Sequence, residues 1–294
     1  MSLPVPVPPS WKDLGKSSSD LLGRDYPFHA IGLEIKTKTP SNVSFKVAGT
    51  RDSKSGVIAG DLEAKYTENK YGTVLTNTWT TSNVLRTQLE VENQLAKGLK
   101  LEAHTSLNPD KGINSGLFNL TFKQPGYHAR TSLDLFHGNN ITSDIVLARN
   151  GVLVGAETNY NINDGAITRY ATALGYSAPD YAITLHGLSN MRLFSASYYH
   201  RVNADVEAGA KAVYNSAASA NGMNLEVGTK VYLDKSAFVK AKIASTGALA
   251  LSYTQTLRPG VKAAFGVAID THKLNDPTVG GSPHRVGAQF TFEN

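Results

Sequence analysis

The sequence predicts an all-β fold: a transmembrane antiparallel β-barrel preceded by one short N-terminal helix. Three observations lead to this prediction. Apolar and polar residues alternate with a period of two over most of the chain, turn-forming residues recur between the alternating runs, and charged residues keep to one parity of each run. Because successive side chains of a strand point to opposite faces, such runs predict strands with one apolar and one polar face, as in a wall between lipid and water.

The clearest hairpin covers residues 248–270. Leu249, Leu251 and Tyr253 alternate with small or polar residues, and the alternation resumes after the tripeptide 258–260. That tripeptide is Arg-Pro-Gly, in which proline restricts φ and glycine accepts a positive φ, so it predicts a turn. Each arm has about nine to ten residues, the length that a tilted strand needs to cross a bilayer.

Similar runs follow one another from residue 30 onward. Clean alternation covers 31–36, 43–48, 58–65, 75–79, 85–91, 99–107, 118–123, 128–135, 152–161, 206–215, 225–231 and 286–293. A Lys or Arg facing lipid at the bilayer centre costs roughly 2–4 kcal/mol, which explains why the apolar parity of these runs carries no charge. The stretches 142–149, 166–176 and 191–200 are less regular, and their register is not predicted. Units of roughly 14 residues give about 18 to 20 strands.

The composition is compatible with a membrane barrel and argues against several other classes of protein. The chain has 294 residues, a mean hydropathy of −0.23, a net charge of +5 and no cysteine. No apolar run is long enough for a spanning helix. The positive charge suits an anionic partner, but no Lys/Arg block or nucleic-acid-binding motif indicates nucleic acid. A propeller or tandem sandwich would bury strands on both faces, and the continuous apolar runs that this requires are absent from the sequence.

Residues 1–28 are expected to form an N-terminal segment ahead of a barrel at 29–294. Ser10 is a candidate N-cap for a helix that runs from Trp11 to about Leu22. One side of that helix carries Trp11, Leu14, Ser18, Leu21 and Leu22, a narrow stripe that predicts docking on a wall. The N-terminus lacks the pattern of a secretory signal, so an unprocessed barrel points to an organelle outer membrane.

No pattern of catalytic, cofactor-binding or metal-binding residues is found. The eight histidines are scattered, and the sequence has no HExxH, GxGxxG, GxxxxGK[ST] or GxSxG motif. The absence of cysteine removes disulfides, zinc–thiolate sites and cysteine nucleophiles. The sequence therefore indicates neither an enzyme nor a cofactor or metal site.

Several separated motifs resemble the mitochondrial porins, the voltage-dependent anion channels, and the fungal members in particular. The N-terminal residues Pro8-Pro9-Ser10-Trp11, Asp13-Leu14-Gly15-Lys16-Ser17 and Asp20 resemble the helix of that family. The segment from Leu95 to Lys100 resembles its GLK element, and Phe194 to His200 with Val202-Asn203 and Val206 to Gly209 is similar to fungal sequences. The resemblance covers essentially the whole chain.

The resemblance implies a function as well as a fold. It implies 19 strands, a helix inside the lumen, and a voltage-gated, weakly anion-selective pore for ATP, ADP, phosphate and small metabolites in the mitochondrial outer membrane. It implies nucleotide contacts at Lys16 and Arg24 and, more weakly, at Lys100. The other candidates for pore-lining anion contacts are Lys12, Lys46, Lys65, Lys123, Lys211 and Lys230.

The expected partners follow from the same resemblance. They are nucleotides and small anionic metabolites as permeants, membrane lipid, and the outer-membrane import and assembly machinery; a homo-oligomer is left open. Gly287, Phe290 and Phe292, with Arg285, are similar to the sorting signal of mitochondrial barrels. Two alternatives remain at this point: a barrel of the same family that serves protein import, and a soluble all-β binding protein.

Two departures from the family pattern are present. Asn77 stands where many animal members have a lipid-facing Glu, so an effect of that acid is not expected here. The segment 23–28, after the predicted helix, keeps one glycine and adds a proline, which puts a swinging helix in doubt.

Charge on the polar parity of the predicted strands is nearly balanced. Ten basic and ten acidic residues share it, so the walls alone predict only a weak bias towards anions. The remaining positive charge is expected from Lys12, Lys16 and Arg24 and from the strand that holds Lys240 and Lys242.

Overall fold

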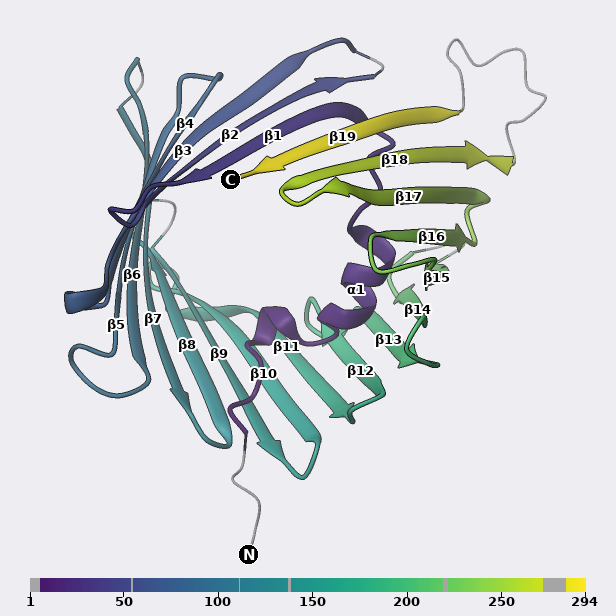
Figure 1. Ribbon diagram of the computed structural model, residues 1–294. Coiled ribbons are helices and arrows are strands. Elements are labelled where there is room, and N and C mark those ends of the chain that lie inside the picture. Colours follow the sequence, from purple (N-terminus) through teal and green to yellow (C-terminus); the bar gives the residue numbers. More distant parts are fainter. Residues whose placement is uncertain (1–5, 54, 111, 137–138, 219–221, 272–283) are drawn as a thin grey trace, which may run out of the picture.

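The chain folds into a closed barrel with its N-terminal segment inside, in a computed structural model that describes residues 6–53, 55–110, 112–136, 139–218, 222–271 and 284–294 (Figure 1). Within these residues one sheet contains 19 strands. The predicted fold class is confirmed. Among the described residues, no helix combines the length and the apolarity needed to cross a membrane.

The elements follow one another in chain order. They are η1 (Trp11–Asp13), α1 (Lys16–Gly23), β1 (Ala30–Lys38), β2 (Val43–Asp52), β3 (Ile58–Glu68), η2 (Asn69–Tyr71), β4 (Thr73–Thr80), β5 (Leu85–Glu92), β6 (Leu99–Asn108), β7 (Gly112–Gln124), β8 (Tyr127–Asp134), β9 (Asn140–Arg149), β10 (Val152–Asn161), β11 (Ala166–Ser177), β12 (Tyr181–Leu188), β13 (Leu193–Arg201), β14 (Val206–Asn215), β15 (Met223–Tyr232), β16 (Ala237–Ala244), β17 (Ala248–Arg258), β18 (Val261–Asp270) and β19 (Arg285–Glu293).

Each strand pairs antiparallel with the next one along the chain, and the barrel closes between its first and last strands. An odd number of up-and-down strands brings these two together pointing the same way. The closing pair β1–β19 is accordingly parallel, with a register that runs from Ile31 opposite Ala288 to Lys36 opposite Glu293. The predicted antiparallel barrel therefore has one parallel seam.

The alternation of the sequence becomes the two faces of the wall. In the hairpin β17–β18, Leu251 and Phe265 are exposed on the outside, whereas Ser252 and Thr254 are buried on the inside. The predicted turn lies at 258–260, with Gly260 at φ +79°. Two arginines share the outward parity at strand ends, Arg51 opposite Ile31 and Arg149 opposite Val152. From a strand end, an arginine side chain can extend its charged guanidinium group to the membrane surface.

The three irregular stretches fall in β9, β11 and β13. Their alternation is faint because inward positions are apolar too: Val146 in β9 and Ala171 and Ala173 in β11 are buried hydrophobic residues. These inward residues lie beneath the N-terminal segment, which shields them from water.

The predicted continuous helix is wrong in one respect: it is broken at Gly15. The 3₁₀ turn η1 ends at Asp13, and α1 begins at Lys16. Gly15 has φ +73°, a conformation that glycine adopts readily, and a Cβ there would lie 2.8 Å from Oγ of Ser197. Ser10 does not cap a backbone N–H; its Oγ donates to Oδ2 of Asp13 at 2.6 Å.

Candidate functional site

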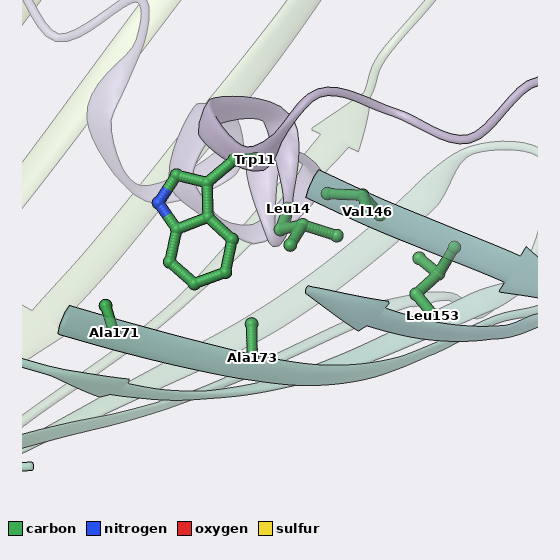
Figure 2. Packing of buried hydrophobic residues seen from close by; sticks show 6 residues of the cluster. All are labelled: Trp11, Leu14, Val146, Leu153, Ala171 and Ala173. Atoms are coloured by element: carbon green, nitrogen blue, oxygen red, sulfur yellow. The ribbon is translucent and has the colours of Figure 1, made fainter. Parts of the chain in front are cut away.

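The N-terminal segment is attached to the inner wall at its start by an apolar cluster. Trp11 and Leu14 pack against Val146, Leu153, Ala171 and Ala173 of strands β9, β10 and β11, and all six are buried (Figure 2). Gly155 of β10 makes room for them, because a Cβ there would lie 2.9 Å from the Trp11 ring. The ring of Trp11 also meets His186 edge-on, with centroids 5.8 Å apart.

Helix α1 continues along the same wall over β13, β14 and β15. Leu21 and Leu22 are buried there, above Gly209 and Gly228, where an added Cβ would lie 2.7 Å from a leucine methyl group in each case. Ser18 Oγ donates to the carbonyl of Ala210 at 3.1 Å. The predicted apolar stripe is confirmed, and the segment lines the lumen on one side of the barrel (Figure 1).

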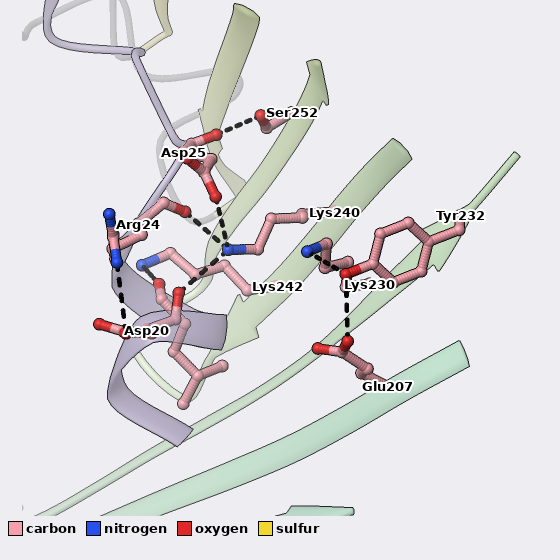
Figure 3. Close-up of polar contacts among 10 residues, drawn as sticks. Asp20, Arg24, Asp25, Glu207, Lys230, Tyr232, Lys240, Lys242 and Ser252 are labelled. Carbon is pink, nitrogen blue, oxygen red and sulfur yellow. Dashed lines mark hydrogen bonds and ion pairs between the residues drawn. The ribbon is translucent and has the colours of Figure 1, made fainter. Parts of the chain in front are cut away.

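At its end the segment is held by polar contacts from β16 and β17 (Figure 3). Lys240 Nζ donates to the carbonyls of Asp20 at 3.0 Å and Arg24 at 2.8 Å, and Lys242 Nζ donates to the carbonyl of Leu22 at 2.7 Å. Ser252 Oγ donates to the carbonyl of Asp25. Lys240 is only 2% exposed.

The linker into β1 crosses strands β18 and β19 at glycines. A Cβ on Gly266 would lie 3.0 Å from Pro27, and one on Gly287 would overlap the Pro27 carbonyl oxygen. Before this crossing, Tyr26 is buried beside Lys240 and Lys242, whose ammonium groups lie 5.2 and 5.0 Å from its ring centre. Burial, with the nearby Asp25 carboxylate, raises the pKa of Tyr26 well above its ordinary range.

The exposed side of the segment carries the predicted contacts Lys12, Lys16 and Arg24. Lys16 Nζ pairs with Asp13 at 2.8 Å, and Arg24 pairs with Asp20 at 3.5 Å; the two basic side chains stay 57% and 70% exposed. The hydrogen bond from Lys16 lowers the pKa of Asp13, and the same contact raises the pKa of Lys16. The segment carries three basic residues, Lys12, Lys16 and Arg24, and three acidic residues, Asp13, Asp20 and Asp25, so its side chains have no net charge.

Several predicted contacts on the wall are already paired with acids. Lys46 lies 3.7 Å from Glu34, which also pairs with Lys36 at 2.7 Å. Lys100 lies between Glu90 at 2.9 Å and Glu102 at 2.5 Å.

Two recesses of the lumen bring predicted contacts from the segment and from the wall together. One of about 510 Å³ brings Lys12 together with Lys100 and Lys123. Another of about 460 Å³ brings Arg24 together with Lys230, whose ammonium group lies 4.3 Å from the ring centres of both Tyr232 and Phe238.

The remaining predicted contacts are separate from these recesses. Lys65 is on β3, far round the wall from α1 (Figure 1), and Lys211 is on the inner face of β14.

Sequence comparison identifies the family. A model of the eukaryotic porins matches residues 7–280. The chain belongs to the eukaryotic porin family. The mitochondrial outer membrane protein porin of Neurospora crassa is 42% identical over 287 residues, 97% of this chain and 99% of the relative. That of Candida albicans is 38% identical over 287 residues, with the same coverage. Non-selective voltage-gated ion channel 1 of Saccharomyces cerevisiae is 35% identical over 289 residues, 97% of this chain and 99% of the relative.

These findings confirm the predicted resemblance to fungal porins and the predicted location. The relatives are porins of the mitochondrial outer membrane, and the outward face of this porin exposes large apolar side chains such as Leu33, Leu62 and Leu185. The family indicates a pore and not an enzyme.

The sequence did not reveal the role of Lys240 and Lys242. Both were expected to supply unpaired positive charge to the lumen. Instead Lys240 is buried and pairs with Asp25 at 3.5 Å, and the ammonium groups of both lysines bind backbone carbonyls of the N-terminal segment. Alternation in β16 indicates that both face inward, but it does not reveal a partner more than 200 residues away. Inward-facing glycines such as Gly155 and Gly209 are the sequence feature that could have indicated where the segment crosses the wall.

Proposed function

We propose that this porin is a voltage-gated, weakly anion-selective pore that passes ATP, ADP, phosphate and small metabolites across the mitochondrial outer membrane. The observation that carries the proposal is the position of residues 10–28. They lie inside the closed barrel, where the side chains of Lys16 and Arg24 remain exposed to the lumen. The relatives described as voltage-gated channels support gating by voltage.

Weak selectivity follows from the charge pattern. Wall lysines such as Lys46 and Lys100 are neutralised by nearby glutamates, and the bases of the segment stand beside aspartates. In a salt-filled lumen a charge acts over about one Debye length, roughly 8–10 Å, so opposite charges within that distance largely cancel for a passing ion. The anion preference is therefore modest and grows as salt is lowered.

The predicted contacts divide between two places in this proposal. Lys12, Lys100 and Lys123 meet an anion near the start of the segment, and Arg24 and Lys230 meet it near the end. Lys16 stands between them, and Lys46, Lys65 and Lys211 contribute from the wall. A phosphate group carries several charges, so it is attracted more strongly than chloride to each place.

A planar-bilayer recording tests the proposal. The double variant Lys16→Glu, Arg24→Glu is expected to shift the reversal potential in a salt gradient towards cation preference and to reduce ATP flux more than chloride flux. The matched control reverses Lys70 and Lys235, which lie at turns between strands and change the net charge equally. Wild-type reversal potential and wild-type ATP flux in the double variant would refute the proposal.

The alternatives receive less support. The relatives carry the names of porins and ion channels, which favours a metabolite pore over a protein-import barrel. An outer belt with exposed residues such as Leu33, Val47 and Phe265 is suited to lipid and not to a soluble binding protein.

We further propose that Gly287, Phe290 and Phe292 contribute to recognition by the assembly machinery, and that residues 1–28 act as one unit separate from the barrel at 29–294.

A further inference from the structure

The carboxyl end of α1 does not finish in a glycine turn. The last four carbonyl groups of a helix have no partner within the helix, and many helices satisfy them with a glycine turn. Arg24 follows α1 in an extended conformation, with φ −83° and ψ 156°, so the chain leaves the helix directly. The Arg24 N–H still donates to the Asp20 carbonyl at 3.0 Å, and the carbonyl groups beyond Asp20 need partners from elsewhere.

Strand β16 provides those partners (Figure 3). Lys240 binds the carbonyls of Asp20 and Arg24, and Lys242 binds that of Leu22, across separations of 216 to 220 residues. Positive charge is favourable at this end because the helix dipole is negative there.

The surroundings of Lys240 match the chemistry of an ammonium group. A lysine has three N–H donors and no acceptor. Nζ of Lys240 has three acceptors within 3.5 Å: the carbonyls of Asp20 and Arg24 and Oδ2 of Asp25. Because the side chain is also buried, a residue of similar shape without donors cannot replace it.

Helix α1 has only eight residues. Isolated helices of that length are not stable in water, because the cost of nucleation is not recovered within two turns. Its apolar side is supported by β13 to β15, and its last turn is supported by β16. Docking on the wall and formation of the last turn are therefore coupled.

We infer that Lys240 and Lys242 are positioning residues that fix α1 to the wall and complete its last turn. Consequently, α1 does not leave the wall as an intact helix: release from β16 unravels its carboxyl end. Displacement of the N-terminal segment from the wall therefore also unfolds the last turn of α1. This inference is independent of ion selectivity and is tested without measuring it.

The experiment uses a single thiol in a chain that has no cysteine. Ser18→Cys is nearly isosteric, and Ser18 is buried between α1 and β14 at 2% exposure, so a water-soluble maleimide reaches it only when α1 is released. The labelling rate is compared in full-length protein carrying Lys240→Met, Lys242→Met or Lys240→Arg. The control is Lys36→Met, which removes from β1 a lumen charge that is paired with Glu34 and not with the backbone of α1. Backbone carbon chemical shifts of residues 16–23 report the helix, and far-UV circular dichroism reports the barrel.

Lys240→Met is expected to raise the labelling rate about ten- to a hundredfold, the range for lost hydrogen bonds to a charged group, and to abolish the helical shifts of the last turn. Lys242→Met has a smaller effect of the same kind, Lys240→Arg restores most of the protection, and Lys36→Met changes neither reading. Unchanged labelling in a folded Lys240→Met barrel overturns the inference, as does fast labelling with intact helical shifts. If Lys240→Met fails to fold, Lys242→Met against Lys36→Met decides by the same two readings.

Discussion

The inner wall of this porin has two parts that are built from different residues. Strands β1 to β7 turn long charged side chains inward, such as Lys36, Glu63 and Lys100, several of them joined in ion pairs. Strands β10 to β19 place small residues beneath the N-terminal segment: Gly155, Ala171, Ala173, Ser197, Gly209, Gly228, Ala250, Ser252, Gly266 and Gly287. The first part forms the bare wall, and the second forms the covered wall.

One alternating pattern therefore serves two different surfaces. On the bare wall the polar parity faces water and charges stay solvated in pairs. Where the N-terminal segment crosses the covered wall, the same parity faces protein, and small residues at these positions let the segment approach closely. Packing against backbone is sensitive to single methyl groups, whereas solvated charges tolerate change. Substitutions on the two walls should therefore differ strongly in their effects.

The largest effect is expected at Gly287 on the covered wall. A side chain there would overlap the carbonyl of Pro27, so Gly287→Glu should prevent closure of the barrel, and Gly287→Ala should lower the free energy of unfolding by about 3 kcal/mol. The control is Gly49→Ala, where an added Cβ meets nothing within 4 Å. Refolding yield in detergent and assembly into isolated mitochondria are the measurements.

The same pair of assays separates packing from recognition at this end of the chain. Phe290→Asp, with its charge on the outward parity, is expected to block assembly into mitochondria while import into the intermembrane space continues. Normal assembly of both Gly287→Glu and Phe290→Asp would contradict the proposed role of this strand.

A smaller effect is expected at Gly155, beneath Trp11. A valine there would press on the indole ring and should weaken docking of the start of the segment by about 1–3 kcal/mol. The emission of Trp11, measured in a Trp79→Phe background, should shift towards that of a solvated indole. Thr78→Val on the bare wall is the control, and an equal shift there would remove the distinction between the walls.

The smallest effect is a dependence on pH at Asp13. Its pKa is lowered from the ordinary value of 3.8 by the hydrogen bonds from Lys16 and Ser10. A lowered pKa in the folded state means that the carboxylate stabilises the segment above the ordinary pKa and loses this contribution as the pH falls through the lowered one. Emission of Trp11 should therefore report loosening of η1 only in strong acid, and Asp13→Asn should remove that transition. If the transition persists in Asp13→Asn, another titratable group causes it.

The sequence predicts most of the barrel but little of the covered wall. The hairpin at β17–β18 could be predicted because lipid on one side and water on the other impose alternation on Leu251 and Ser252. The register of β11 could not be predicted from the sequence. Its inward residues Ala171 and Ala173 face protein and are apolar, so the two parities of this strand look alike. The break at Gly15 and the partners of Lys240 depend on residues far away in the sequence, which no local pattern encodes.

The most direct test compares the accessibility of the two walls. Single cysteines are introduced at Thr78 on the bare wall and at Ala173, which is 3% exposed beneath Trp11 and Leu14. Both variants are reacted, as folded barrels in lipid, with a small charged thiol reagent. We expect the thiol of Thr78→Cys to react at least about tenfold faster than that of Ala173→Cys, because opening of a docked segment costs more than about 1.4 kcal/mol. Equal rates would contradict it, since they would mean that the N-terminal segment does not cover this wall.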